Sequence, residues 1–223
     1  MRFSAILFDL DGTLLDTLED IADATNAALR TLGVAEYPVS DYKIFVGDGV
    51  ETLIQRVLPP ERNTPEMAAR CADLMRAEYG RCWSRKSRPY PGVPEVLDEL
   101  TRRAVPMAVL SNKPHGFTQL CVAKLLPRWK FAAALGLTAD RPKKPHPAGA
   151  LEIAAAMRLR PDEILYVGDT NTDMQTAVAA GMYPVGALWG FRDAAELLEN
   201  GAKQLIADPS QVLDVFDGVR HES

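Results

Sequence analysis

The sequence predicts an α/β protein with a doubly wound parallel-sheet core and an inserted all-helical cap domain. Over the second half of the chain, short apolar strands alternate with helical stretches at the spacing of parallel βαβ units. The first apolar strand, Ser4–Asp9, is cut off from the others by residues 16–85, where helical patterns prevail and no convincing strand is found. The simplest arrangement is a helical domain inserted into a sheet domain.

The helical block contains three stretches with apolar residues at helical spacing. These stretches are 18–32, 50–58 and 67–82. Gly33 ends the first of them and Pro59 ends the second, because glycine favours the residue after a helix and proline cannot continue one. We therefore assign residues 16–85 to the cap, and residues 1–15 and 86–223 to a Rossmann-like catalytic core.

The core is predicted from an alternation of strands and helices after Arg88. The expected strands are Val105–Leu110, Ala133–Leu137, Glu163–Val167, Met182–Ala187 and Leu205–Ile206. The expected helices are Glu95–Arg103, Pro114–Leu126, Pro147–Met157, Thr172–Ala180, Ala194–Glu199 and Gln211–Phe216. In such folds ligands bind beyond the carboxyl ends of the strands.

Composition and net charge exclude some classes of binding partner and indicate the compartment. The 223 residues are 47% hydrophobic and 25% charged, which is ordinary for a globular protein with one sizeable core and a small second domain. A net charge of −5 argues against nucleic acid or an anionic membrane as partner. Neither a signal peptide nor an apolar run of the ~18 residues that span a membrane is visible. Three cysteines without metal-like spacing fit a reducing compartment, so we expect a cytoplasmic protein.

Polar and acidic residues follow three of the predicted strands. They are Asp9 and Asp11, then Ser111 and Asn112, then Asp169 and Asp173. Parallel strands place their carboxyl ends at one edge, so these residues should converge. Two carboxylates at 4 Å repel by roughly 4 kcal/mol at an effective dielectric near 20, which calls for a shared proton, a hard cation, or both. Carboxylate ligands without cysteine favour Mg²⁺ over Zn²⁺.

A lysine near this edge would allow it to bind an anion. Lys143 and Lys144 both precede the predicted helix 147–157. Lys144 is favoured because it adjoins Pro145-His146-Pro147, and Lys143 is the competitor. Together with Ser111 and backbone N–H groups, a magnesium ion and a lysine would form a cradle for phosphate that faces a carboxylate nucleophile.

The order of these motifs resembles that of the haloacid-dehalogenase-like hydrolase superfamily, over the whole chain. Asp9-Leu10-Asp11-Gly12-Thr13 resembles its first motif, Ser111 its second, Lys144 its third, and Gly168-Asp169 with Asp173 its fourth. Within the superfamily the chain is similar to phosphoglycolate phosphatases with a small helical cap. That likeness is carried by Val46-Gly47-Asp48-Gly49, Tyr90-Pro91-Gly92-Val93, Lys144-Pro145-His146-Pro147, and Ala177, Ala180 and Gly181 after Asp173.

The resemblance implies a role for each catalytic residue. Asp9 would attack phosphorus and become an aspartyl phosphate. Asp11 would protonate the leaving alkoxide and then deprotonate water. Ser111 and the N–H group of Asn112 would hold phosphoryl oxygens, and Lys144 would neutralise Asp9 and the phosphoryl group.

The resemblance also implies a Mg²⁺ site and its surroundings. The ligands would be Asp9, the carbonyl of Asp11, and Asp169, while Asp173 would orient these ligands and Thr13 would support the loop after Asp11. The candidate substrate contacts are Gly47, Asp48 and Gly49 of the cap and His115 of the core.

The expected function is Mg²⁺-dependent hydrolysis of a small phosphorylated metabolite, with 2-phosphoglycolate first, by a monomer or homodimer. A pyrophosphatase or a β-phosphoglucomutase-like enzyme of the same superfamily stays open. Thr13 favours hydrolysis, because family mutases typically have another residue there. A non-catalytic phosphometabolite-binding regulator is the alternative from another class, although such a protein would not need Asp11.

Overall fold

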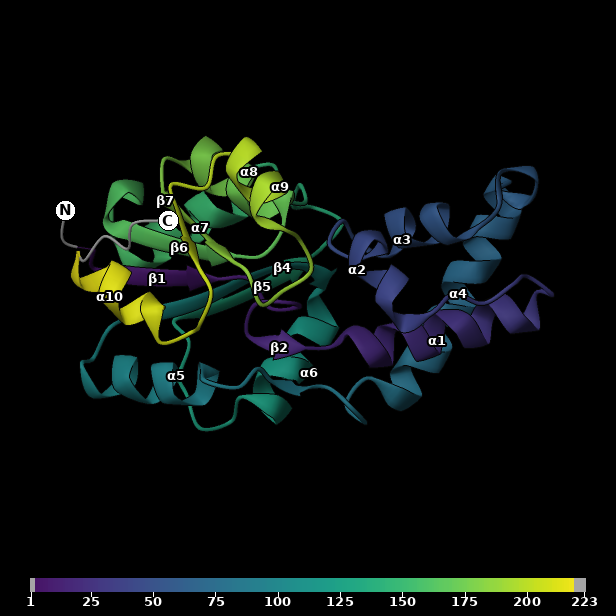
Figure 1. Ribbon diagram of the computed structural model, residues 1–223, viewed down its shortest axis with the longest axis horizontal. Helices are drawn as coiled ribbons and strands as arrows, with labels where there is room; N and C mark the ends of the chain where they lie inside the picture. The colour runs from purple at the N-terminus through teal and green to yellow at the C-terminus, as the bar shows by residue number, and fades with distance from the viewer. Residues whose placement is uncertain (1–2, 219–223) are drawn as a thin grey trace.

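The computed structural model describes residues 3–218, and its centre is a six-stranded parallel sheet (Figure 1). The strand order is β5-β4-β1-β6-β7-β8. The strands are β1 (Ala5–Phe8), β4 (Met107–Pro114), β5 (Ala133–Leu137), β6 (Ile164–Gly168), β7 (Tyr183–Ala187) and β8 (Gln204–Ile206). The predicted doubly wound α/β fold is confirmed.

Helices cover both faces of the sheet because β1 is apolar on both sides. Ile6 and Phe8 point into one core cluster, whereas Ala5 and Leu7 point into another, as the alternation of a strand requires. Helices α5 (Val93–Arg102), α6 (His115–Leu125) and α10 (Gln211–Asp217) pack on the first face. Helices α7 (Ala148–Met157), α8 (Asn171–Ala180) and α9 (Ala194–Glu199) lie on the second.

Between β1 and β4 the chain forms a helical cap that extends beyond the carboxyl ends of the strands (Figure 1). Its helices are α1 (Leu18–Thr31), α2 (Tyr42–Phe45), α3 (Val50–Val57) and α4 (Pro65–Cys82), with 3-10 turns η1 (Val39–Asp41) and η2 (Pro60–Arg62). They enclose a core of their own, to which Leu29, Tyr42, Ile54 and Cys71 contribute fully buried side chains. Helix α2 is too short for apolar periodicity to reveal it.

The two chain crossings between core and cap are joined to each other. Strand β2 (Leu15–Asp16) pairs antiparallel with β3 (Arg88–Pro89), so a short strand lies across the predicted boundary at residues 15 and 16. Buried Asp20 in α1 accepts hydrogen bonds from the backbone N–H groups of Lys86 and Ser87 and from Ser87 Oγ. These contacts fix where the cap sits relative to the strand ends.

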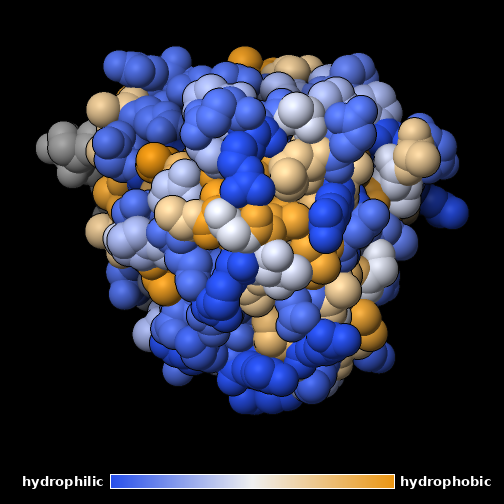
Figure 2. All heavy atoms as spheres, turned by 90° about the vertical axis from the view of Figure 1, so that its right-hand side faces the viewer, coloured by the Kyte–Doolittle hydropathy of each residue, from blue (hydrophilic) through white to orange (hydrophobic). Residues whose placement is uncertain are grey.

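The surface at the cap end is mixed in polarity. Figure 2, which views that end, shows hydrophobic atoms in the middle of the face among mostly hydrophilic ones. In the part of the chain that the structure describes, no helix has both the length and the apolar character that a membrane span requires.

Candidate active site

Three neighbouring strands bring the predicted residues together. Because β1 lies between β4 and β6, Asp9 at the end of β1 has Ser111 of β4 on one side and Asp169 after β6 on the other. All three side chains are buried or nearly so. The convergence predicted from parallel strand ends is therefore present.

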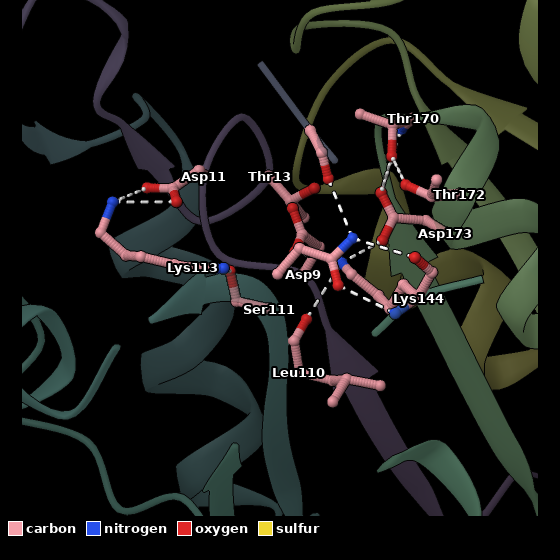
Figure 3. A network of polar contacts seen from close by, with 12 residues as sticks. Asp9, Asp11, Thr13, Leu110, Ser111, Lys113, Lys144, Thr170, Thr172 and Asp173 are labelled. Atoms are coloured by element: carbon pink, nitrogen blue, oxygen red, sulfur yellow. Dashed lines mark hydrogen bonds and ion pairs between the residues drawn. The ribbon is translucent and has the colours of Figure 1, made fainter. Parts of the chain in front are cut away.

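Lys144 is the lysine that reaches Asp9. Its Nζ donates hydrogen bonds to Asp9 Oδ1 and Asp173 Oδ1, both at 2.6 Å, and to the Leu110 carbonyl at 3.2 Å (Figure 3). Lys143 points elsewhere: its Nζ donates to the Asp48 carbonyl at 2.9 Å and to Thr52 Oγ1 at 3.2 Å in the cap. The choice that the sequence left open is thus made by geometry.

Burial and charge act in opposite directions on Lys144. Burial disfavours the ammonium, but the carboxylates of Asp173 and Asp9 outweigh it and hold the pKa of Lys144 well above its ordinary value. The lysine is therefore a fixed positive charge between two acids.

Asp173 uses its two oxygens for different purposes. Oδ1 accepts from Lys144 and from the Tyr166 hydroxyl at 3.2 Å, whereas Oδ2 accepts from Thr170 N at 3.1 Å and Thr170 Oγ1 at 2.7 Å. The bond from Thr170 N is one half of a capping box at the start of α8, in which the Asp173 N–H group in turn donates to the Thr170 side chain. Asp173 therefore both caps the helix and orients the lysine.

Asp169 is held by Thr13 and by backbone. Thr13 Oγ1 donates to Asp169 Oδ1 at 2.7 Å, and the Phe191 N–H group donates to Oδ2 at 2.9 Å. A Cβ at Gly12 or Gly190 would overlap the Asp169 side chain, so both loops approach this carboxylate closely. Thr13 therefore supports the site through Asp169, which is 156 residues away in the sequence.

We expect Gly190→Ala to destabilise the protein by about 1–3 kcal/mol, because the new methyl group overlaps Asp169. Urea denaturation measures the free energy of unfolding. Gly80→Ala in α4 is the matched control, since its added methyl group meets nothing within 4 Å and alanine favours a helix. Equal stability of Gly190→Ala and wild type would contradict the tight packing around Asp169.

A hard cation fits the acidic cluster. Oxygens of Asp9, Asp169 and Asp173 lie within 4.8 Å of one another, and Lys144 offsets only part of their charge. Burial raises the pKa of Asp9 well above its usual range, and Asp173 adds to this against the opposing effect of Lys144. Burial and then Asp173 raise the pKa of Asp169 to about 7. Crowded, buried carboxylates of this kind could hold Mg²⁺.

The Asp11 carboxylate is not part of this cluster. Lys113 Nζ donates to its two oxygens at 2.9 and 3.0 Å, and Thr17 Oγ1 donates at 2.7 Å. In Figure 3 the Asp11–Lys113 pair lies on the side of Asp9 opposite Lys144. Any contact of Asp11 with the metal would therefore use its carbonyl, which is the atom that the family resemblance implies.

Asn112 joins the cap to the core. Its Nδ2 donates to the Gly47 carbonyl at 3.1 Å and to the Lys144 carbonyl at 3.2 Å, and its Oδ1 accepts from Lys144 N at 2.9 Å. Ser111 Oγ accepts from the Lys113 N–H group at 3.2 Å and its side chain lines the cavity described next. The Asn112 side chain thus holds the loop that carries Lys144 and links it to Gly47 of the cap.

A cavity of about 70 Å³ lies between cap and core above Asp9. The core contributes Asp9, Asp11, Ser111, Asn112, Lys113, Pro114, Phe117 and Thr170. The cap contributes Ile21, Val46, Gly47, Gly49, Val50, Leu53, Met75, Arg76 and Tyr79. Because roughly 10–15 Å³ is the least that holds one water molecule, the cavity has room for more than one water, as expected of a small-molecule site.

Two of the four candidate substrate contacts line this cavity and two do not. Gly47 and Gly49 line it, whereas Asp48 pairs with Arg56 at 2.5 Å. His115, the first residue of α6, accepts from the Gly136 N–H group through Nδ1 at 3.2 Å and is not a lining residue. The side chain of Asp48 is bound by the Arg56 guanidinium and that of His115 by the Gly136 backbone.

Sequence reasoning missed Lys113, which lines the cavity beside Ser111. The expected strand ended at Leu110, but β4 continues to Pro114. Residues two apart on a strand share a face, so extending the strand would have placed Lys113 with Ser111. Thr170 and Tyr166, which donate hydrogen bonds to Asp173, were not marked by any pattern in the sequence.

Known proteins resemble this chain over most of its length. The family model for haloacid dehalogenase-like hydrolases matches residues 6–187. A phosphoglycolate phosphatase of Nitrosospira multiformis is 32% identical over 89% of both chains. One of Photorhabdus laumondii is 33% identical over 95% of this chain and 92% of its own.

Solved structures agree with the sequence comparisons. A crystal structure from Lactobacillus delbrueckii subsp. bulgaricus superposes with a TM-score of 0.91 at 29% identity, over 97% of this chain and 99% of its own. The relatives confirm the predicted phosphatase class. With motifs, fold and family model in agreement, the chain belongs to the haloacid dehalogenase-like hydrolase family.

Proposed function

We propose that this phosphatase is a Mg²⁺-dependent phosphomonoester hydrolase that acts through an aspartyl phosphate on Asp9, with 2-phosphoglycolate as its first candidate substrate. The observation that carries the proposal is the buried Asp9 at the cavity floor, with Lys144 at 2.6 Å and Asp169 in the same carboxylate cluster. The names of the relatives support the choice of substrate.

The arrangement supports attack by Asp9 on phosphorus. Lys144 binds Oδ1 of Asp9, which leaves Oδ2 for the bond to phosphorus. Ser111 Oγ and the Asn112 N–H group would bind phosphoryl oxygens, and Lys144, held by Asp9, Asp173 and the Leu110 carbonyl, would neutralise the negative charge of Asp9 and the phosphoryl group. Bound Mg²⁺, held by Asp9, Asp169 and the Asp11 carbonyl with Asp173 nearby, would neutralise further charge there.

Asp11 is the group available for proton transfer. Its carboxylate lines the same cavity as Asp9 but lies outside the acidic cluster. It would give a proton to the alkoxide that leaves phosphorus and later take one from the water that hydrolyses the acyl phosphate. The cap would exclude bulk water during the first of these steps.

The size of the cavity supports a small metabolite as the partner. A cavity of this size between cap and core supports a small phosphorylated metabolite, rather than a nucleic acid, as the ligand. Cys71, Cys82 and Cys121 are free, in keeping with a reducing cytoplasm. We propose a monomer or homodimer.

Phosphate release from a panel of metabolite phosphates, with and without Mg²⁺, tests the function. The panel includes 2-phosphoglycolate, pyrophosphate and β-glucose 1-phosphate, and the last is also assayed for isomerisation. Release from 2-phosphoglycolate that stops on chelation of Mg²⁺ supports the proposal. A folded protein that binds these compounds without turnover would be a binding protein instead, and preference for pyrophosphate would make it a pyrophosphatase.

We expect Mg²⁺ to raise the melting temperature more at about pH 8 than at about pH 6. Because the folded pKa of Asp169 is about 7, the metal-free protein holds protons that the unfolded chain has lost, and it loses stability as pH rises from about 4 through 7. Mg²⁺ competes with those protons, so its stabilisation grows over the same range. Differential scanning fluorimetry at both pH values measures this. In Asp169→Asn, Mg²⁺ should raise the melting temperature only slightly at either pH. A rise in the wild type that does not depend on pH would refute Asp169 as a metal ligand.

A further inference from the structure

Lys113 is a buried cation in the cavity wall that the proposed chemistry does not use. Its side chain is 5% exposed, and its Nζ contacts both oxygens of Asp11. The same Nζ lies 4.8 Å from the ring centroid of Tyr79, which belongs to cap helix α4. Lys113 therefore lies where cap, cavity and the proposed acid–base residue meet.

The other cations near the cavity are less suited to bind a second anionic group of a substrate. Lys144 is bound to two carboxylates and is assigned to the phosphoryl group. Among the described residues that line the cavity, the cationic ones are Lys113 and Arg76. Arg76 is 42% exposed and pairs with Glu51 at 2.6 Å and Asp73 at 3.2 Å.

The remaining cap wall offers no charge. It consists mainly of Ile21, Val46, Val50, Leu53 and Met75. A carboxylate placed against these side chains would lose its hydration without a compensating partner, at a high cost in free energy. Such a group is therefore directed to Lys113.

The hydrogen bonds of Asp11 hold its carboxylate away from the position that proton transfer requires. Two hydrogen bonds from Lys113 and one from Thr17 hold its carboxylate. To reach the leaving oxygen above Asp9, Asp11 must give up part of this hold. A substrate carboxylate that binds Lys113 would replace Asp11 as the counter-charge of the buried ammonium, which stays paired. Asp11 would leave Lys113 as the neutral acid, in the form that gives its proton to the leaving oxygen.

We propose that Lys113 is the specificity-determining residue: it binds a carboxylate on the alcohol part of the substrate and thereby releases the Asp11 side chain. The inference rests on the proposed phosphomonoesterase function and deepens it. The substrate class is the phosphate monoesters of short hydroxy acids, in which the carboxylate lies close enough to phosphorus for both to fit the cavity. A neutral alcohol part leaves Asp11 paired with Lys113.

The test compares 2-phosphoglycolate with its neutral amide, 2-phosphoglycolamide, in the full-length protein. The wild type should prefer the acid. In Lys113→Met, kcat/KM for the acid should fall about 10- to 100-fold, the worth of a charged hydrogen bond, while that for the amide should not fall, because loss of Lys113 also removes the group that holds Asp11. Lys113→Arg should retain part of the preference. Exposed Lys130→Met is the control for loss of one positive charge, and it should leave both values unchanged.

A binding measurement separates failure of this inference from failure of the proposed function. Calorimetry on Asp9→Asn, and on Asp9→Asn with Lys113→Met, gives the affinity for acid and amide without turnover. Loss of affinity for the acid alone supports Lys113 even if the wild type releases no phosphate, in which case only the proposed function fails. Equal losses for both compounds, or a preference that survives in Lys113→Met and disappears in Arg76→Met, would overturn the role of Lys113.

Discussion

Asp9→Asn should abolish phosphate release, by about 10⁴-fold or more, while the protein stays folded. An amide oxygen is a poor nucleophile and cannot form the acyl phosphate. The fold should tolerate the change, because Asn has nearly the same shape and Lys144 keeps its ion pair with Asp173. Steady-state release of phosphate from the best substrate measures the first effect, and thermal unfolding measures the second.

The stability of Asp9→Asn should equal or exceed that of the wild type at about pH 8. Burial and the neighbouring carboxylates disfavour the charged form of Asp9, as its raised pKa indicates, so a neutral side chain relieves repulsion. Asp16→Asn is the matched control, since Asp16 lies in β2 and does not line the cavity. Retention by Asp9→Asn of more than about a tenth of the wild-type rate would mean that another residue is the nucleophile.

Lys144→Met should cost about 3–5 kcal/mol of unfolding free energy at about pH 8, in addition to turnover. Removal of one partner from a buried ion pair leaves uncompensated charge, and here two carboxylates, Asp9 and Asp173, lose their partner. Chemical denaturation in the absence of Mg²⁺ measures the loss. Mg²⁺ should restore part of the stability but not the rate.

The deficit of Lys144→Met should shrink as pH falls towards about 5. Without the ammonium, which opposes the rise, the pKa of Asp9 rises further, so the folded state takes up a proton before the unfolded chain does and gains stability on acidification. Lys143→Met is the control, because its Nζ contacts only a carbonyl and a hydroxyl of the cap. Equal losses of unfolding free energy in the two variants, or a loss independent of pH, would contradict the buried pairing of Lys144 with Asp9 and Asp173.

Much of the fold and part of the site could be predicted from the sequence, because the signals are local. Apolar strands followed by acidic or hydroxyl residues predicted which strands have their carboxyl ends at the candidate active site. The structure places Asp9, Ser111 and Asp169 there. The alternation of strands and helices predicted the order of elements. Short elements such as α2 and the β2–β3 pair were missed, because two to four residues cannot display a period.

The order of its motifs alone determined the family of this protein, since each motif is a short run whose residue types meet one chemical need. Only the tertiary structure decided which side chains pair. Lys143 and Lys144 are neighbours in sequence, yet the loop turns one to the cap and the other to Asp9, which is 135 residues away. The tertiary structure also pairs Asp11 with Lys113, which is 102 residues away. Contacts between such distant segments depend on how the strands and the cap are placed, so they leave no periodic pattern in the sequence.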